Sequence, residues 1–203
     1  MILAFDTSGE HCTAALFAGD GALIARADER IGRGHAERLV PMLAELIGDR
    51  RPESIAVGVG PGSFTGLRVA IAAAHGLAIG WNAPLTGFSS IALAAAAVPS
   101  ETDPIAVALV GGHGQLFVQQ FDGRTLAPLD AIASLVPEAA AAAVRARRVA
   151  GSGAALLIAA RGFGEAVEVA PAAADLFRLP RALRALDPRP VYVRAPDAKA
   201  KAA

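Results

Sequence analysis

The sequence predicts an α/β protein built from two similar halves, each a mixed β-sheet flanked by helices. Hydrophobic residues make up 54% of the 203 residues and charged residues only 19%, so the chain can bury a large core. Each half opens with β-prone runs joined by tight turns and continues with alternating helices and strands. Hairpins make antiparallel neighbours and helical crossovers make parallel ones, so each sheet should be mixed.

The first half contains a strand, a hairpin and then alternating helices and strands. The helix predicted from His35 carries apolar residues at helical spacing and stops at Gly48, a residue type common just past helix ends. A glycine-rich turn, Gly58–Gly66, connects a short strand to a long apolar helix. The predicted strands are 2–5, 12–18, 22–27, 54–59 and 84–87, and the predicted helices are 35–47, 64–80 and 89–97.

The second half repeats this order after a linker at residues 98–104, which contains two prolines and several polar residues. We therefore predict two domains, 1–100 and 101–203, with an irregular tail at the end of the second. The predicted strands are 105–110, 115–121, a third after Asp122-Gly123, 148–150 and 191–194. The predicted helices are 131–146, one ending at Ala160, and an alanine-rich helix at 172–185.

Charge argues against a protein whose main work is binding nucleic acid. Lys and Arg together number 19, as do Asp and Glu, so no net positive field attracts phosphates. Two small arginine clusters, at residues 145–148 and 178–184, are expected to be solvated helix faces. Contact with nucleic acid is then auxiliary at most.

The single cysteine and the N-terminus favour a cytoplasmic protein. Cys12 has no internal disulfide partner, which fits a reducing compartment. The N-terminal segment has no basic region, and its apolar run is interrupted by a carboxylate at Asp6, so it does not fit the pattern of a secretion signal. The apolar segments are too short or too interrupted by charge for a membrane span, and we expect none.

Two segments have residue types that contact phosphates in other proteins. Asp6-Thr7-Ser8 follows the first strand and offers a carboxylate and two hydroxyls, which suit hydrated Mg²⁺, although a simple turn explains the same residues. Gly58–Gly66 leads into a helix whose N-terminus could receive an anion, yet no lysine follows as in a P-loop. The four histidines lack metal-site spacing, and no catalytic nucleophile is visible.

The helices 35–47 and 64–80 are apolar beyond a single stripe, and the second also carries many small residues. Such helices are buried on most sides. Burial inside the chain and burial against a second protein explain this pattern equally well.

Four segments resemble the bacterial TsaB (YeaZ) family of tRNA threonylcarbamoyladenosine biosynthesis proteins. They are Ile2–Ser8, His35–Pro41, the string Gly60-Pro61-Gly62-Ser63-Phe64-Thr65-Gly66-Leu67-Arg68 and the ending Tyr192-Val193-Arg194. The resemblance is clear through about residue 97 and thinner beyond it. Gly111-Gly112-His113 departs from the Asp-Ala-Arg-like sequence usual in the family at that position.

The resemblance implies a fold of two actin-like domains, as in sugar kinases and Hsp70, with mixed sheets flanked by helices. It also implies an accessory subunit without its own catalytic residues. Such a subunit pairs with the catalytic paralogue TsaD and, with the ATPase TsaE, supports formation of N6-threonylcarbamoyladenosine at position 37 of tRNAs that read ANN codons. ATP or ADP and Mg²⁺ are then expected only in the complex with TsaE, and the chain alone is expected to form a homodimer.

The resemblance places the partner interface on the two N-terminal-domain helices. The residues expected there are Leu39, Leu43, Leu46, Leu67, Ile71, Ala74 and Leu77. The paired histidines that hold the metal in the catalytic paralogue align with Ser90 and Ala94, so no metal site is expected here.

The alternative is an ATP-dependent phosphotransferase of the actin-like fold. In that hypothesis Asp6 positions Mg²⁺ and the turn Gly151-Ser152-Gly153 contacts adenosine. The candidate nucleotide contacts are Asp6, Thr7, Ser8, Gly151 and Gly153.

Overall fold

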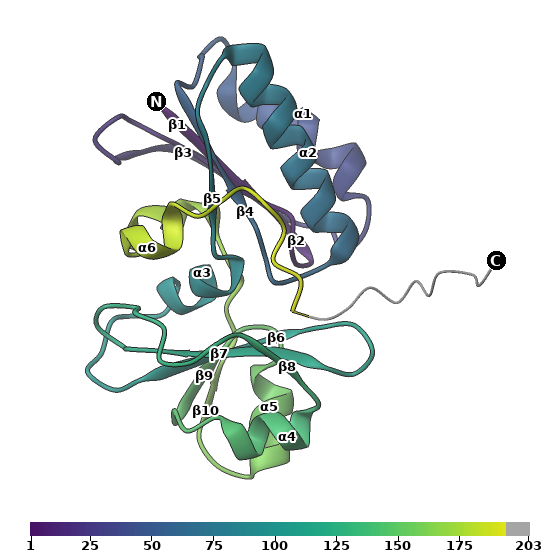
Figure 1. Cartoon of the computed structure of the whole chain (residues 1–203), viewed down its shortest axis with the longest axis vertical. Helices are drawn as coiled ribbons and strands as arrows, with labels where there is room; N and C mark the ends of the chain where they lie inside the picture. The colour runs from purple at the N-terminus through teal and green to yellow at the C-terminus, as the bar shows by residue number, and fades with distance from the viewer. Residues whose placement is uncertain (194–203) are drawn as a thin grey trace, which may run out of the picture.

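The computed structural model describes residues 1–193 as two five-stranded mixed sheets, one above the other along the long axis of the molecule (Figure 1). The first sheet has the order β3-β2-β1-β4-β5, and the second has the order β8-β7-β6-β9-β10. Counted from the start of each half, both orders are 3-2-1-4-5, with an antiparallel hairpin side and a parallel side. The duplicated actin-like fold is thus confirmed.

The strands of the first sheet are β1 (Ile2–Asp6), β2 (His11–Phe17), β3 (Leu23–Arg30), β4 (Ser54–Gly58) and β5 (Leu85–Phe88). Helices α1 (His35–Ile47) and α2 (Phe64–Trp81) cover one face, while α3 (Ser90–Ala96) and the 3₁₀ helix η1 (Ala173–Arg178) lie on the other. Successive side chains of β1 pack into hydrophobic clusters on opposite faces of the sheet. Leu3 and Phe5 pack under α1 and α2, whereas Ala4 faces the α3 side.

The strands of the second sheet are β6 (Ile105–Val110), β7 (Leu116–Phe121), β8 (Ala133–Leu135), β9 (Arg148–Ala150) and β10 (Glu165–Val167). Helices α4 (Pro137–Ala143) and α5 (Ala154–Arg161) cover its outer face and close a core of their own. Its inner face contributes Val107 and Phe121 to the cluster around α3.

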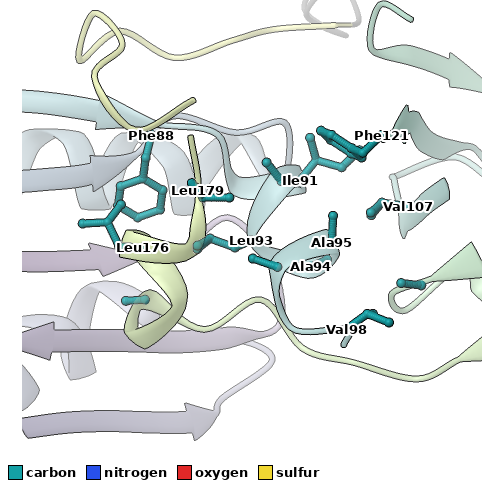
Figure 2. Close-up of a cluster of buried hydrophobic side chains, with 14 of the residues drawn as sticks. Phe88, Ile91, Leu93, Ala94, Ala95, Val98, Val107, Phe121, Leu176 and Leu179 are labelled. Atoms are coloured by element: carbon teal, nitrogen blue, oxygen red, sulfur yellow. The ribbon is translucent and has the colours of Figure 1, made fainter. Parts of the chain in front are cut away.

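Helix α3 lies between the two sheets, and all seven of its residues are buried (Figure 2). Phe88 and Leu176 lie at one end of this cluster and Phe121 and Val107 at the other, with Ile91 between them. The two halves therefore share one continuous hydrophobic core, and α3 is its centre.

The last described segment returns to the first sheet. After η1 come the short helix α6 (Arg181–Arg184), a bridge between Leu186 and Gly87, and a 2.7 Å hydrogen bond from Val191 N to Val59 O. The predicted ranges 1–100 and 101–203 thus separate the two sheets but not every element that packs on them. Whether either range folds alone stays a prediction.

Four predicted elements in the second half are wrong. No strand directly follows Asp122-Gly123, because the chain turns there and the third strand of this sheet begins only at Ala133. Proline explains two of the other three. The predicted helix 131–146 begins instead with strand β8, because Pro137 fits only the first turn of a helix and favours extended backbone before it. Pro180 likewise divides the predicted helix 172–185 into η1 and α6. Val191–Val193 forms no strand, and Arg194 and the predicted tail 199–203 lie outside the described residues. The edge strand β10 is absent from the predicted elements.

Helix α2 is, by length and composition alone, the one helix among residues 1–193 that could cross a membrane. Its place in the fold is that of a core helix, since Ala70, Ile71 and Ala74 are buried against the first sheet. Ser63 caps its N-terminus by accepting a hydrogen bond from Gly66 N.

Candidate functional site

The two segments with phosphate-contacting residue types, Asp6-Thr7-Ser8 and Gly58–Gly66, meet at the carboxyl ends of β1 and β4. Ideal Cβ atoms placed on Gly58, Gly62 and Gly66 would overlap the Asp6 carboxylate, the Ser8 carbonyl and the Thr7 carbonyl respectively. Gly62 and Gly66 are required because the backbone of Ser8 and Thr7 lies directly against them, and Gly58 is required because the Asp6 side chain does. Packing within the chain alone accounts for this glycine spacing.

Hydrogen bonds connect the two segments, and we call the place where they meet the junction. Thr7 Oγ1 donates to Gly66 O at 2.7 Å, and Ser63 N donates to Ser8 O at 2.6 Å. Ser8 N donates to Asp6 Oδ1 at 2.5 Å, which fixes the carboxylate. The Thr7 hydroxyl is buried and already used inside the chain.

A cleft of about 720 Å³ opens between the two halves at this junction. Its lining mixes polar residues with apolar and aromatic ones. The polar lining comprises Asp6, Ser8, Glu10, His11, Thr13, His35, Ser63, Thr65 and Ser152, and the apolar lining includes Phe64, Leu109, Val110, Phe117, Val169, Pro171, Val191, Tyr192 and Val193.

The cleft brings together only part of the predicted nucleotide contacts. Asp6 and Ser8 line it, whereas Thr7, Gly151 and Gly153 do not. The two glycines pack against the Ala108 carbonyl and neighbouring side chains of the second sheet, where a Cβ would collide. Ser152 between them does reach the cleft, and its Oγ accepts a 3.0 Å hydrogen bond from Val110 N.

Asp6 and His35 line the cleft, and each has one buried side-chain atom without a hydrogen-bond partner among the described residues. Asp6 is 2% exposed, and its Oδ2 and the buried Nε2 of His35 make no hydrogen bond to any described residue. Burial raises the pKa of the Asp6 carboxyl above 3.8, and the Ser90 and Ser8 hydroxyls, the Ser8 backbone N–H and the His35 charge oppose that rise. Sequence reasoning considered His35 only as a metal ligand and missed that it lines the same cleft as Asp6.

Asp6→Asn is expected to stabilise the fold at neutral pH. Folding raises the pKa of this carboxyl, so the free energy of unfolding falls as the pH rises from the unfolded-state pKa through the folded-state pKa. Removing the charge should add about 1–3 kcal/mol at pH 7, the usual cost of a poorly satisfied buried polar group. Urea unfolding of both proteins from pH 3 to pH 8 measures this. The difference should shrink toward zero as the pH falls well below 3.8, where Asp6 is protonated in both states, and a constant difference would contradict the assignment.

Most of the predicted interface residues face the sheet under α1 and α2, while Leu43 and Leu77 also line an exposed groove between the two helices. Six of the seven are buried in the core of the chain: Leu39, Leu43, Leu46, Leu67, Ile71 and Ala74. Leu77 is half-buried. The correction has a simple cause, because the positions that follow helical spacing most closely are the ones turned toward the sheet.

The exposed surface of these two helices forms a groove of about 480 Å³, which we call the α1–α2 groove. Its lining is mostly apolar or small and comprises Val40, Leu43, Ala44, Ile47, Gly48, Arg50, Ala73, Gly76, Leu77 and Trp81. Val40 is 61% exposed, and a Cβ added to Gly76 would meet no atom within 4 Å.

The positions aligned with the metal-holding histidines do not fit a metal. Ser90 Oγ accepts a 2.9 Å hydrogen bond from Gly60 N, and Ala94 is a methyl group in the shared core. Among residues 1–193 no group of three or more His, Cys, Asp or Glu side chains could hold a metal ion. No step that needs a bound metal can be built on these donors.

The chain is similar to known proteins in sequence and in structure. The family model described as TsaD, tRNA N6-adenosine threonylcarbamoyltransferase, matches residues 28–161. The chain is 39% identical to the tRNA threonylcarbamoyladenosine biosynthesis protein TsaB of Escherichia coli (strain K12), over 44% of this chain and 40% of that protein. It is 38% identical to the TsaB protein of Haemophilus influenzae, over 44% of this chain and 39% of that one.

The solved structure of YeaZ from Pseudomonas aeruginosa aligns with a TM-score of 0.78 and 28% identity, over 94% of this chain and 98% of that chain. The aligned region spans about two fifths of the length of the curated relatives. The structural alignment covers both halves of the chain. Together these findings show that the chain belongs to the TsaB (YeaZ) family, related in sequence to TsaD.

Proposed function

We propose that this protein is an accessory, non-catalytic subunit in the formation of N6-threonylcarbamoyladenosine at position 37 of tRNAs that read ANN codons. Its relatives are named for threonylcarbamoyladenosine biosynthesis, and the matched family model is named for the transferase itself. The partner we propose is TsaD, bound in the cytoplasm through the α1–α2 groove. The observation that carries the proposal is this exposed apolar groove on helices of the first half.

The groove has the character of a docking surface for a helix. Three of its lining residues, Ala44, Ala73 and Gly76, are small and allow another backbone to approach closely. Val40 and Leu77 add apolar side chains for contact. Ile79, on the neighbouring turn of α2, is 81% exposed. Exposed apolar grooves of this kind are a common feature of protein interaction sites. A second copy of the chain can cover the same groove when TsaD is absent, which predicts a homodimer that TsaD displaces.

The residues of this chain favour an accessory role over a catalytic one. Ser90 and Ala94 offer no metal ligands, and the cleft shows no lysine or arginine among its described lining residues. A phosphotransferase needs cationic groups or a metal to stabilise charge on the transferred phosphoryl group. We therefore propose that ATP and Mg²⁺ act in the complex through TsaE, and that contact with tRNA is made by the partners.

Gly76→Glu tests the groove without disturbing the fold. The new side chain has open space, and glutamate forms helix better than glycine, so the variant should fold at least as well as the parent. A carboxylate buried at this mostly apolar interface should weaken binding to TsaD about 100-fold or more. Size-exclusion chromatography with light scattering, followed by calorimetric titration with TsaD, measures this.

The matched control is Ala155→Glu, which places the same side chain at an exposed position of α5 on the second half. It should bind TsaD as the parent does. If Gly76→Glu also binds normally, TsaD docks elsewhere. If the parent binds no TsaD even with TsaE and ATP present, the proposed function fails.

A further inference from the structure

At the start of α2, three exposed side chains form one cluster, which we call the Arg68 cluster: Phe64, Arg68 and Tyr192. Tyr192 belongs to the last described segment, which crosses the first sheet from α6 to the start of α2 (Figure 1). The Arg68 guanidinium lies over the Phe64 ring, 3.8 Å from its centroid. Arg68 Nε donates a 3.2 Å hydrogen bond to Tyr192 Oη, and the centroids of the two aromatic rings are 5.2 Å apart.

Arg68 carries a positive charge that no described carboxylate neutralises. Among residues 1–193, no Asp or Glu lies within ion-pair distance of its guanidinium. Its Nε is used by Tyr192, whereas Nη1 and Nη2 make no hydrogen bond to any described residue. A guanidinium with free Nη groups fits a carboxylate closely. The ring contact and the Tyr192 bond already fix this side chain, so a partner that binds it loses little to ordering.

The cluster is continuous with the exposed face of α2 beside the α1–α2 groove. Side chains three or four residues apart are neighbours on one helical face. By this rule one face of α2 contains five exposed residues: Phe64, Arg68, Ala72, His75 and Ile79. Gly76, which lines the groove, borders this face and is eight residues from Arg68, about 12 Å along the helix axis. A partner that fills the groove and lies along α2 therefore reaches the cluster.

We propose that Arg68 is a specificity-determining residue of the TsaD interface and pairs there with a carboxylate of TsaD. This inference rests on the proposed function. Aromatic residues and arginine are enriched among the residues that dominate binding energy, and the cluster presents both. Arg68 is the only lysine or arginine in α2, and Ala72 and Ile79 on its face are apolar. One cation on an apolar face suits a protein surface with an acidic side chain, whereas a nucleic acid needs several cations.

Calorimetric titration of the whole chain with TsaD, in low-salt and in high-salt buffer, tests the pairing. At low salt Arg68→Gln should weaken binding about 10-fold and Arg68→Glu about 100-fold, because the second variant also repels the carboxylate. High salt should shrink the difference between the parent and Arg68→Gln, because salt screens an ion pair near the surface. The matched control is Arg145→Glu, the same reversal at an exposed arginine of the second half, which should bind as the parent does.

Tyr192→Phe separates the ion pair from a merely structural role of the cluster. It removes the hydrogen bond to Arg68 but keeps the charge and the ring, so binding should weaken only about threefold or less. An effect as large as that of Arg68→Gln would mean that the cluster only holds the last described segment in place, and the proposal would be wrong. Circular dichroism confirms that each variant is folded.

Two further outcomes separate this proposal from the proposed function. If Arg68→Glu binds TsaD normally while Gly76→Glu does not, TsaD uses the groove but not Arg68, and only the present proposal fails. The same holds if Arg68→Glu weakens the homodimer measured by light scattering but not the complex with TsaD, since a second copy then covers the cluster. If the parent binds no TsaD, the proposed function itself fails.

Discussion

Replacing Gly66 by alanine is expected to destabilise the protein by about 3 kcal/mol or more, because the new methyl group overpacks a rigid junction and breaks a hydrogen bond. Gly66 stands in the first turn of α2 with the Thr7 carbonyl where its Cβ would be. The obstacle is backbone, so it cannot move aside as a flexible side chain could. Separation of α2 from β1 would also stretch the bond from Thr7 Oγ1 to Gly66 O.

Gly76→Ala is the matched control within the same helix. Gly76 is exposed and its Cβ direction is open, so alanine should stabilise the fold by about 0.5–1 kcal/mol through helix propensity alone. Thermal unfolding followed by circular dichroism should give a melting temperature roughly 10 °C lower for Gly66→Ala and a few degrees higher for Gly76→Ala. Equal changes in the two variants would show that the junction is not tightly packed.

This contrast shows what the motif spacing could and could not predict. The sequence places Asp6-Thr7-Ser8 after a strand and Gly58–Gly66 before a helix, and both placements are correct. Glycine in such a turn fits a phosphate or a close backbone equally well. Only the tertiary contact between two parallel strands, β1 and β4, shows that the backbone fills the space.

The helices give a similar lesson about faces. Apolar periodicity correctly predicts α1, residue for residue, and nearly all of α2. It could not say which apolar residues serve a partner, since Leu39 and Ile71 follow the pattern because they face the sheet. The groove is signalled instead by what interrupts the pattern, namely Val40 on the polar side of α1 and Gly76 in the middle of α2.

The shared core predicts that the two halves unfold together. Phe121 lies on β7 of the second sheet and is fully buried in the cluster that surrounds α3 (Figure 2). Truncating it to alanine should cost about 3–5 kcal/mol, the range for a large aromatic side chain removed from a packed core. Because the same cluster includes Phe88 and Ala4 of the first sheet, that loss should be felt on both sides of α3.

Trp81, the single tryptophan, reports on the first half, since it ends α2 and packs with the core under α1 and α2. In Phe121→Ala its fluorescence transition should move down by roughly 10 °C and coincide with the transition seen by far-ultraviolet circular dichroism. Leu157→Ala, in the separate core beneath α4 and α5, is the comparison. If Trp81 kept its original transition in Phe121→Ala while circular dichroism became biphasic, the halves would be independent domains. A coincident shift would instead mean that α3 holds them as one folding unit, so the orientation of the two cleft walls is fixed by the same buried side chains that stabilise the fold.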